Sequence, residues 1–146
     1  MTQQLEGKTA LVTGGSRGIG FACAMKLAEQ GAKVFLAASN PERLHQASEA
    51  IRSKTSRDSG FHASDLRDIE GCQQTANALI KQFNRCDILI NSAGATKGGI
   101  FPGQPDEEMV DGFALKFHSA VRLSRMLWPE LKKNRGCVIN IVGGFS

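Results

Sequence analysis

The sequence lacks several features, and each absence excludes a class of function. No tyrosine occurs among the 146 residues, so a reaction of this chain has no phenol hydroxyl as a proton carrier. No apolar run approaches the length of a membrane-spanning helix. The polar start, Met1-Thr2-Gln3-Gln4, does not resemble a signal peptide. These absences predict a cytoplasmic protein without membrane partners.

Cysteine pairs and basic stripes are also missing. The four cysteines contain no Cys-x-x-Cys pair, and Cys23 and Cys137 fall in apolar segments, so we expect buried thiols in a reducing compartment. The net charge of +4 is spread out, and its densest part lies at residues 132–135, at the end of an expected helix. No basic stripe with interleaved aromatic residues occurs, so nucleic acid is not an expected partner, and no metal site is expected.

What is present is a glycine turn between a strand and a helix. A short apolar run stops at Thr13, and Gly14, Gly18 and Gly20 follow before a helical pattern begins. Gly14 permits backbone angles closed to other residues, and Gly18 would let the main chain approach a phosphate without a Cβ between them. Gly20 would let the helix pack close to the strand. This arrangement is typical of a pyrophosphate cradle at a helix N-terminus, although tight turns alone also use glycine.

Apolar runs alternate with amphipathic runs along the whole chain. Strands are expected at residues 9–13, 33–38, 60–63, 87–91 and 137–142. Helices are expected at residues 18–30, 41–54, 66–83 and 106–134, the last with a break near Asp111-Gly112. Gly31 and Gly136 fall just past helix ends, where a left-handed residue is needed, and Asn40 before Pro41 is a good N-cap.

The continuous apolar strands predict a sheet that is buried on both faces. Right-handed crossovers then give an α/β fold with a doubly wound parallel sheet in the strand order 3-2-1-4-5. Ligands of such a sheet gather at the carboxyl edge, at the switch point between the first and fourth strands. The turns at residues 14–20 and 91–94 both fall on that edge, and this favours a nucleotide site over a turn of structural value alone.

Three ordered motifs resemble those of the short-chain dehydrogenase/reductase family. Residues 13–20, Thr-Gly-Gly-Ser-Arg-Gly-Ile-Gly, are similar to its Thr-Gly-x3-Gly-x-Gly motif. Asp65-Leu66 resembles its Asp-Val or Asp-Leu pair, and residues 91–94, Asn-Ser-Ala-Gly, resemble its Asn-Asn-Ala-Gly turn. Since the family domain runs to roughly 250 residues, residues 1–146 would form the N-terminal, cofactor-binding part of an incomplete domain.

The resemblance implies a set of cofactor contacts at the motif positions. The glycine turn would bracket the pyrophosphate and adenosine phosphates, and Asp65 would bind the adenine amine beside the Leu66 backbone. The alternative for Asp65 is an N-cap of the following helix, and Asn91 would also stabilise a strand end. The implied cofactor-binding residues are Gly14, Ser16, Arg17, Gly18, Ile19, Gly20, Ser39, Asn40, Asp65, Leu66, Asn91, Ala93 and Gly94.

The end of the second expected strand favours NADP(H) over NAD(H). NAD-binding folds usually place an acid there for the ribose hydroxyls, but residues 37–40 read Ala-Ala-Ser-Asn. Ser39, Asn40, Arg17 and Arg43 offer hydroxyl, amide and guanidinium donors to a 2′-phosphate. The alternative for Arg17 is a surface residue on an exposed turn.

The positions that the family uses for catalysis depart from its pattern. Its reaction uses a tyrosine with a lysine four residues further on, and this chain has no tyrosine. Gly143 stands where the resemblance places a substrate-orienting serine, and Lys116 stands where it places an asparagine of the proton relay. Lys116 is therefore the candidate catalytic residue, and a solvated helix lysine is its equally weighted alternative.

The sequence thus leads to one function and one rival. The expected function is hydride transfer between nicotinamide and a carbonyl or alcohol substrate, by an NAD(P)(H)-dependent oxidoreductase that acts as a homo-oligomer when intact. We expect the 146-residue chain alone to be inactive. The rival is a catalytically silent nucleotide- or partner-binding protein with the same fold, because fold does not determine function.

Overall fold

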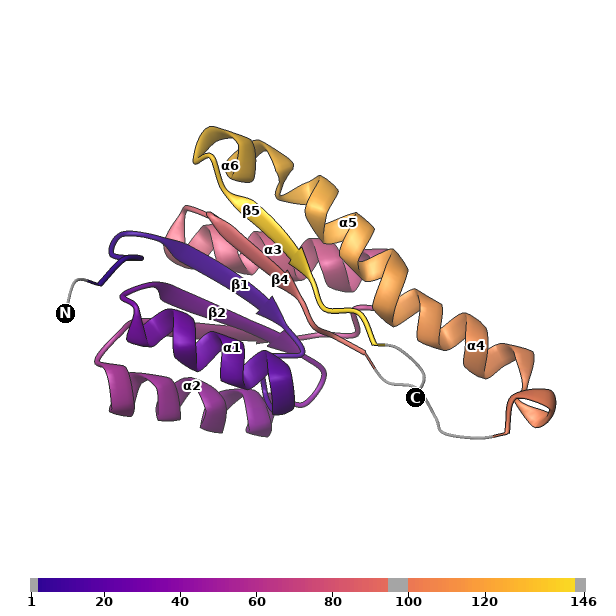
Figure 1. Ribbon diagram of the computed structural model, residues 1–146. Coiled ribbons are helices and arrows are strands. Elements are labelled where there is room, and N and C mark those ends of the chain that lie inside the picture. The colour runs from indigo at the N-terminus through magenta and orange to yellow at the C-terminus, as the bar shows by residue number, and fades with distance from the viewer. Residues whose placement is uncertain (1–2, 95–99, 144–146) are drawn as a thin grey trace.

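The computed structural model describes residues 3–94 and 100–143. Its centre is one parallel sheet in the order β3-β2-β1-β4-β5, as expected for a doubly wound fold (Figure 1). The strands are β1 (Thr9–Thr13), β2 (Lys33–Ala38), β3 (Ser59–Ala63), β4 (Ile88–Asn91) and β5 (Cys137–Asn140). Chain order reverses direction between β1 and β4, which places the switch point where the sequence predicts it.

Helices cover the two faces of this sheet unequally. One face carries α1 (Gly18–Glu29) and α2 (Pro41–Thr55), and the other carries α3 (Ile69–Phe83) and the long helical segment that follows β4 (Figure 1). That segment consists of η1 (Phe101–Gly103), α4 (Asp106–Phe113), η2 (Ala114–His118), α5 (Ser119–Met126) and α6 (Trp128–Lys133).

The alternation of side chains along the central strands divides the core in two. Leu11 and Leu89 pack with α3 and α5, whereas Ala10, Val12 and Ile90 pack with α1 and α2. All five residues of β1 and all four of β4 are buried. The continuous apolar runs of these strands therefore do form a sheet that is buried on both faces, because successive side chains point to opposite layers.

The same expectation is wrong for β5. None of its four residues is buried, and Ile139, Ile141 and Val142 are 44%, 38% and 87% exposed. Val138 alone packs against a core cluster, the one shared with α3 and α5. The reason is topological: β5 is the last strand of the sheet, and the α1–α2 layer does not extend over it (Figure 1).

Several boundaries differ from the sequence expectation. The helix after β3 starts at Ile69 rather than Leu66, because residues 66–68 form a turn instead. The long helix continues through Gly112 and departs from α-geometry two residues later, in the π-turn η2. After α6, Arg135 rather than Gly136 takes the left-handed conformation, with φ = 52°. Gly136 is instead required for close approach, since a Cβ there would lie 2.1 Å from the Asp87 carbonyl oxygen.

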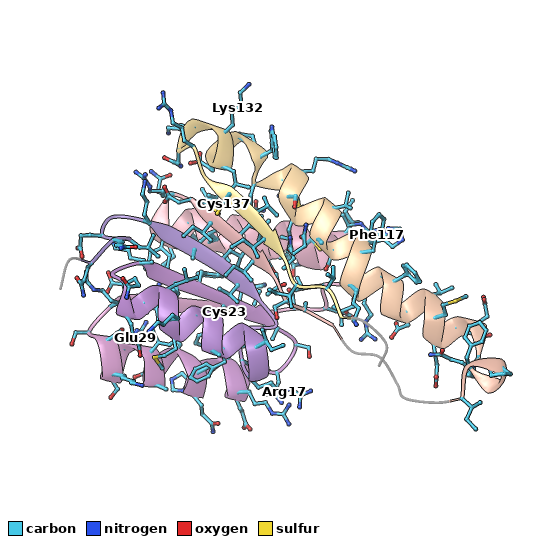
Figure 2. The ribbon with its side chains drawn as sticks, in the orientation of Figure 1. Arg17, Cys23, Glu29, Phe117, Lys132 and Cys137 are labelled. Carbon is cyan, nitrogen blue, oxygen red and sulfur yellow. The ribbon has the colours of Figure 1, made fainter. Side chains whose placement is uncertain are left out.

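The cysteines follow the burial of their elements. All four are free thiols; Cys72 and Cys86 are buried, Cys23 on α1 is half-buried, and Cys137 on β5 is exposed (Figure 2). The expectation of a buried thiol is thus wrong for Cys137, because its strand is uncovered. Within the described ranges, no helix has the length and apolarity to cross a bilayer.

Candidate functional site

The glycine turn lies at the carboxyl end of β1 and leads directly into α1. Gly14 has φ = 64°, and a Cβ there would lie 2.8 Å from the Ser92 carbonyl oxygen. A Cβ on Gly20 would lie 2.2 Å from the Gly14 carbonyl oxygen, so α1 packs directly onto the turn. Gly18 differs from both: its φ is 59°, and a Cβ there would meet no atom within 4 Å. Gly14 and Gly20 are thus required by packing, whereas Gly18 faces open space.

Main-chain N–H groups around Gly18 are free to bind a ligand. Gly14 donates to the Ala37 carbonyl and Phe21 donates to the Arg17 carbonyl, at 2.8 and 3.3 Å. Between them, the N–H groups of residues 15–20 donate to no acceptor in the described parts of the chain. A row of unpaired N–H groups at the start of a twelve-residue helix is the geometry that binds anions, because the helix dipole adds to the hydrogen bonds.

Thr13 joins the two turns of the sheet edge. Its buried hydroxyl oxygen accepts hydrogen bonds from the main-chain N–H groups of Ser92 and Ala93, at 3.1 and 3.0 Å. The turn after β4 is thereby held against the glycine turn after β1. Thr13 was not among the site residues that the sequence predicted, although it stands directly before the first glycine of the motif.

Asn91 ends β4 and links it to β5. Its Nδ2 donates to Asn140 Oδ1 at 2.9 Å, which confirms the expected hydrogen bond at a strand end. Its Oδ1 is buried and has no partner in the described residues. Asn140, which was not among the predicted site residues, lies directly beside Asn91 in the strand register. The carboxyl ends of β4 and β5 therefore carry a polar pair with one acceptor left to satisfy.

The end of β2 supplies hydrogen-bond donors and no carboxylate. Asn40 caps α2 as expected, since its Oδ1 accepts from the Arg43 N–H at 2.9 Å. The cap uses the oxygen and leaves the Asn40 amide nitrogen available. Ser39 is exposed nearby, and Arg17 is exposed on the neighbouring turn, at the N-terminal end of α1 (Figure 2).

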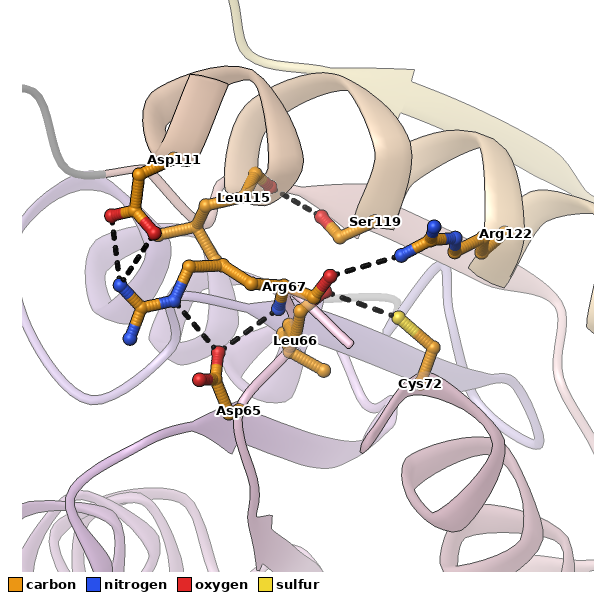
Figure 3. A network of polar contacts seen from close by, with 8 residues as sticks. All are labelled: Asp65, Leu66, Arg67, Cys72, Asp111, Leu115, Ser119 and Arg122. Atoms are coloured by element: carbon orange, nitrogen blue, oxygen red, sulfur yellow. Dashed lines mark hydrogen bonds and ion pairs between the residues drawn. The ribbon is translucent and has the colours of Figure 1, made fainter. Parts of the chain in front are cut away.

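Asp65 belongs to a polar network that the sequence did not predict (Figure 3). Its Oδ1 accepts from the N–H and the Nε of Arg67, at 3.0 and 2.9 Å. Arg67 also donates to Asp111 of α4 at 2.8 Å, and Arg122 of α5 donates to the Arg67 carbonyl at 2.9 Å. The Arg67 guanidinium lowers the pKa of the Asp65 carboxyl, so Asp65 remains an anion. Its Oδ2 has no partner among the described residues.

The alternative of Asp65 as a helix N-cap is wrong. The N-cap position of α3 belongs to Asp68, and Asp65 instead closes the turn before it. Leu66 is 2% exposed, and its carbonyl accepts from the Cys72 thiol at 3.3 Å. The Leu66 N–H has no acceptor in the part of the chain that the structure describes. An acceptor oxygen and a free N–H thus lie on consecutive residues.

Lys116 extends from the π-turn η2 to the carboxyl ends of β4 and β5. Its aliphatic stem lies on Gly94, where an added Cβ would come within 2.8 Å of the Lys116 Cε. Its Nζ lies 3.9 Å from the position that a Cβ of Gly143 would take. The structure therefore brings Lys116, Gly94 and Gly143 together at the edge where the glycine turn also lies.

Comparison with known proteins gives a consistent result. The family model described as "short chain dehydrogenase" matches residues 8–145. A curated relative, 3-oxoacyl-[acyl-carrier-protein] reductase of Chlamydia trachomatis, is 32% identical over 142 residues, which are 97% of this chain and 57% of the relative.

Solved structures give the same fold. L-sorbose reductase from Gluconobacter frateurii, complexed with NADPH and L-sorbose, has a TM-score of 0.88 at 32% identity, over 94% of this chain and 53% of that one. NAD+-bound xylitol dehydrogenase has a TM-score of 0.86 at 24% identity, over 92% and 52%, which shows the shared fold alone. The chain thus spans just over half the length of these three proteins.

Proposed function

Because the chain belongs to the short-chain dehydrogenase family, whose curated members include oxidoreductases, we propose that it binds NADP(H) for hydride transfer to or from a carbonyl or alcohol substrate. The observation that carries the proposal is the row of unpaired N–H groups at residues 15–20, beside the open space at Gly18. Within residues 3–94 and 100–143, no other stretch at this edge of the sheet has so many consecutive main-chain N–H groups without an acceptor. A pyrophosphate carries the acceptors that such a row requires.

The chain's residues fit the rest of a dinucleotide in order along the edge. At the adenine, Asp65 Oδ2 would accept from the exocyclic amine and the Leu66 N–H would donate to a ring nitrogen. Asn91, Ala93 and Gly94 would line the ribose, next to the buried Asn91 Oδ1. Ser16, Ile19 and Gly20 complete the start of α1. The bound cofactor would supply the hydride at C4 of its nicotinamide.

The preference for NADP(H) rests on charge at the end of β2. Arg17 and Arg43 bring positive charge, and Ser39 and the Asn40 amide add neutral donors. No carboxylate occurs at residues 37–40, so nothing there would repel a 2′-phosphate or hold both hydroxyls of an unphosphorylated ribose. The NADPH-bound L-sorbose reductase, 32% identical, supports the same direction.

On the substrate side, Lys116 is the proposed catalytic residue. It places an ammonium group beside Gly143, which has no side chain. An ammonium donates hydrogen bonds and stabilises negative charge on a reacting oxygen. This is a role in orienting the substrate and stabilising charge at that oxygen.

A second candidate function is nucleotide binding without catalysis. The specific observation in its favour is that the chain has no tyrosine and that Gly143 carries no hydroxyl. Both candidates share the cofactor site and differ only in turnover. Assays of the gene product with NADPH and a panel of ketones and aldehydes separate them, since only the oxidoreductase consumes NADPH.

The cofactor site itself is tested by equilibrium titration of the chain with NADPH and with NADH, followed by nucleotide fluorescence. We expect saturable binding of both and a lower dissociation constant for NADPH. A lower dissociation constant for NADH would contradict the preference, and the absence of saturable binding by either nucleotide would contradict the proposed function.

A further inference from the structure

The carboxyl ends of β4 and β5 form a matched pair of open positions. Asn91 and Asn140 lie opposite each other in the parallel register, so Gly94 and Gly143 each stand three residues beyond a paired strand end. Neither glycine has a side chain to fill the space beyond the sheet. The side chain of Lys116 occupies that space, with its stem on Gly94 and its Nζ near Gly143.

The π-turn that carries Lys116 sets its direction. A π-turn inserts an extra residue into a helix and rotates the side chains that follow, and such turns are frequent at functional sites. Here α-geometry is lost only over Ala114–His118, between two regular helices. The contact with Gly94 then restrains the lysine stem, because methylene groups pack while the charged end stays in water. The ammonium is thus directed toward the space beside Gly143 before any ligand arrives.

The positive charge of Lys116 has no counter-ion among residues 3–94 and 100–143. Lys116 makes no ion pair or hydrogen bond with any described residue. Asp111 is the acidic residue of α4 that lies nearest to Lys116 in sequence, and it is bound to Arg67 at 2.8 Å. Asp65 is bound to the same arginine. Arg67 thus neutralises Asp65 and Asp111, and neither carboxylate is paired with the Lys116 ammonium.

We propose that Lys116, held between Gly94 and Gly143, is a carboxylate-binding group, so that the substrate of this site is a hydroxy or oxo acid. The inference rests on the proposed function, since that function makes the ligand a carbonyl or alcohol compound. A carboxylate next to the reacting carbon would accept charge-assisted hydrogen bonds from Nζ, which are about twice as strong as neutral ones. A neutral ketone or alcohol would accept a hydrogen bond from Nζ, as proposed for the reacting oxygen, but it would form no ion pair with the ammonium.

The test uses the 146-residue chain labelled at its lysines with ¹³C and the probe pair lactate and lactamide. The two probes have nearly the same shape and differ in charge, and neither forms an imine with an amine. The Lys116 ¹³Cε signal is assigned by its loss in Lys116→Met, and Lys132 on α6 serves as an exposed reference lysine. We expect lactate to shift the Lys116 signal saturably, with an apparent affinity about tenfold higher than that of lactamide.

The variants complete the test. Lys116→Met keeps the stem on Gly94 and should abolish saturable lactate binding, measured by ligand line broadening. Lys116→Arg, which keeps the charge, and Lys132→Met, the matched control, should retain it. A Lys116 shift no larger than that of Lys132, equal responses to lactate and lactamide, or lactate binding that survives in Lys116→Met would each overturn the proposal.

NADPH titration of the same sample separates this inference from the function on which it rests. Lactate recognition by Lys116 without NADPH binding would contradict the cofactor site alone. NADPH binding without lactate recognition would contradict the carboxylate site alone.

Discussion

Residues 3–94 and the segment from α4 to β5 differ in how much of their apolar surface is buried. Every residue of β1 and β4 is buried, whereas none of the residues of β5 is. On the outer helices, Phe113, Phe117 and Trp128 are each more than half exposed, and Figure 2 shows Phe117 directed away from the sheet. The proposed nucleotide site is therefore built from closely packed elements, while the proposed substrate side is bounded by exposed surface.

This difference separates two kinds of positioning. The donors at residues 15–20 are fixed by glycine packing and by the Thr13 hydroxyl, which holds the two turns together. Lys116 is fixed only by its stem on Gly94 and by the turn from which it extends. We therefore expect cofactor binding to be a property of this chain and turnover to require more than this chain contains. Five predictions test that contrast.

The largest expected effect is the absence of turnover from the 146-residue chain. The chain has no tyrosine, and acid–base help in such reactions is worth about 10²–10⁴-fold before any loss of positioning is counted. Spectrophotometric assays with NADPH and a broad set of ketones, aldehydes and oxo acids measure it. Robust turnover by a pure, monodisperse sample would contradict the prediction and would make Lys116 the first residue to examine.

Gly18→Val should abolish NADPH binding, with a loss of about a hundredfold or more, because the isopropyl group fills the open space that an anion needs. Gly7→Val is the matched control: Gly7 also has a positive φ and open surroundings, but it precedes β1 at the opposite end of the sheet. Both variants should lose similar stability by circular dichroism, and only the first should lose fluorescence enhancement. Unchanged affinity in Gly18→Val would show that the turn is purely structural.

Thiol reactivity should follow the contrast in burial. Burial in the core raises the pKa of Cys86 to about 12, so its thiolate is scarce as well as inaccessible. Cys137 is exposed on β5, and we expect it to react with iodoacetamide at least about a hundredfold faster. Mass spectrometry of timed samples gives the two rates. Equal rates would contradict this prediction, since they would mean that the buried segment before β4 is as accessible to the reagent as β5.

Asp87, which lies in the more buried region of the chain, should contribute about 2 kcal/mol to the free energy of unfolding. Its side chain is 3% exposed; it accepts from the Thr9 N–H at 2.9 Å and from Arg85 at 2.7 Å. Burial opposes its ionisation, but Arg85, the Thr9 N–H and Lys8 outweigh it and lower its pKa. We expect Asp87→Ala to lower the free energy of unfolding in urea, whereas Asp58→Ala, which removes an exposed ion pair with Lys33, should change it by less than about 0.5 kcal/mol.

The pH dependence of this contribution has a definite sign. The folded pKa of Asp87 lies below its ordinary value of about 3.9, so its stabilisation is complete above that value. It is lost as the pH falls through the lower, folded value. The difference between the wild type and Asp87→Ala should therefore shrink in acid, and a difference that grows in acid would contradict the assignment.

The smallest expected effect is on cofactor choice. Ala38→Asp should reduce the NADPH affinity relative to NADH by about tenfold, because a carboxylate at the end of β2 repels a 2′-phosphate and accepts from ribose hydroxyls. Ala38→Asn is the matched neutral control and should change the ratio less. Paired titrations give the ratio of the two dissociation constants. An unchanged ratio in Ala38→Asp would contradict the proposal that the 2′-phosphate binds at this position.

The sequence predicted the strand order and the shared edge, since continuous apolar runs and glycine turns depend on local pattern. It did not predict the contacts that depend on which strands become neighbours, such as Thr13 with the turn after β4, or Asn140 beside Asn91. It also missed the Arg67 link to α4, because 44 residues separate Arg67 from Asp111 and no local pattern connects them. The exposure of β5 was not predicted for a similar reason, because the apolar pattern of a strand does not determine whether a helix covers it.

The central claim, that residues 15–20 bind the pyrophosphate of a dinucleotide, is tested most directly by mapping NADPH on the amide spectrum of the ¹⁵N-labelled chain. We predict the largest chemical-shift changes for the N–H groups of residues 15–20. A separate change is expected for the Leu66 N–H, and none for the Gly7 N–H. Shifts confined to other surfaces, such as the shallow depression lined by His45 and Phe61 between α2 and β3, would contradict the claim.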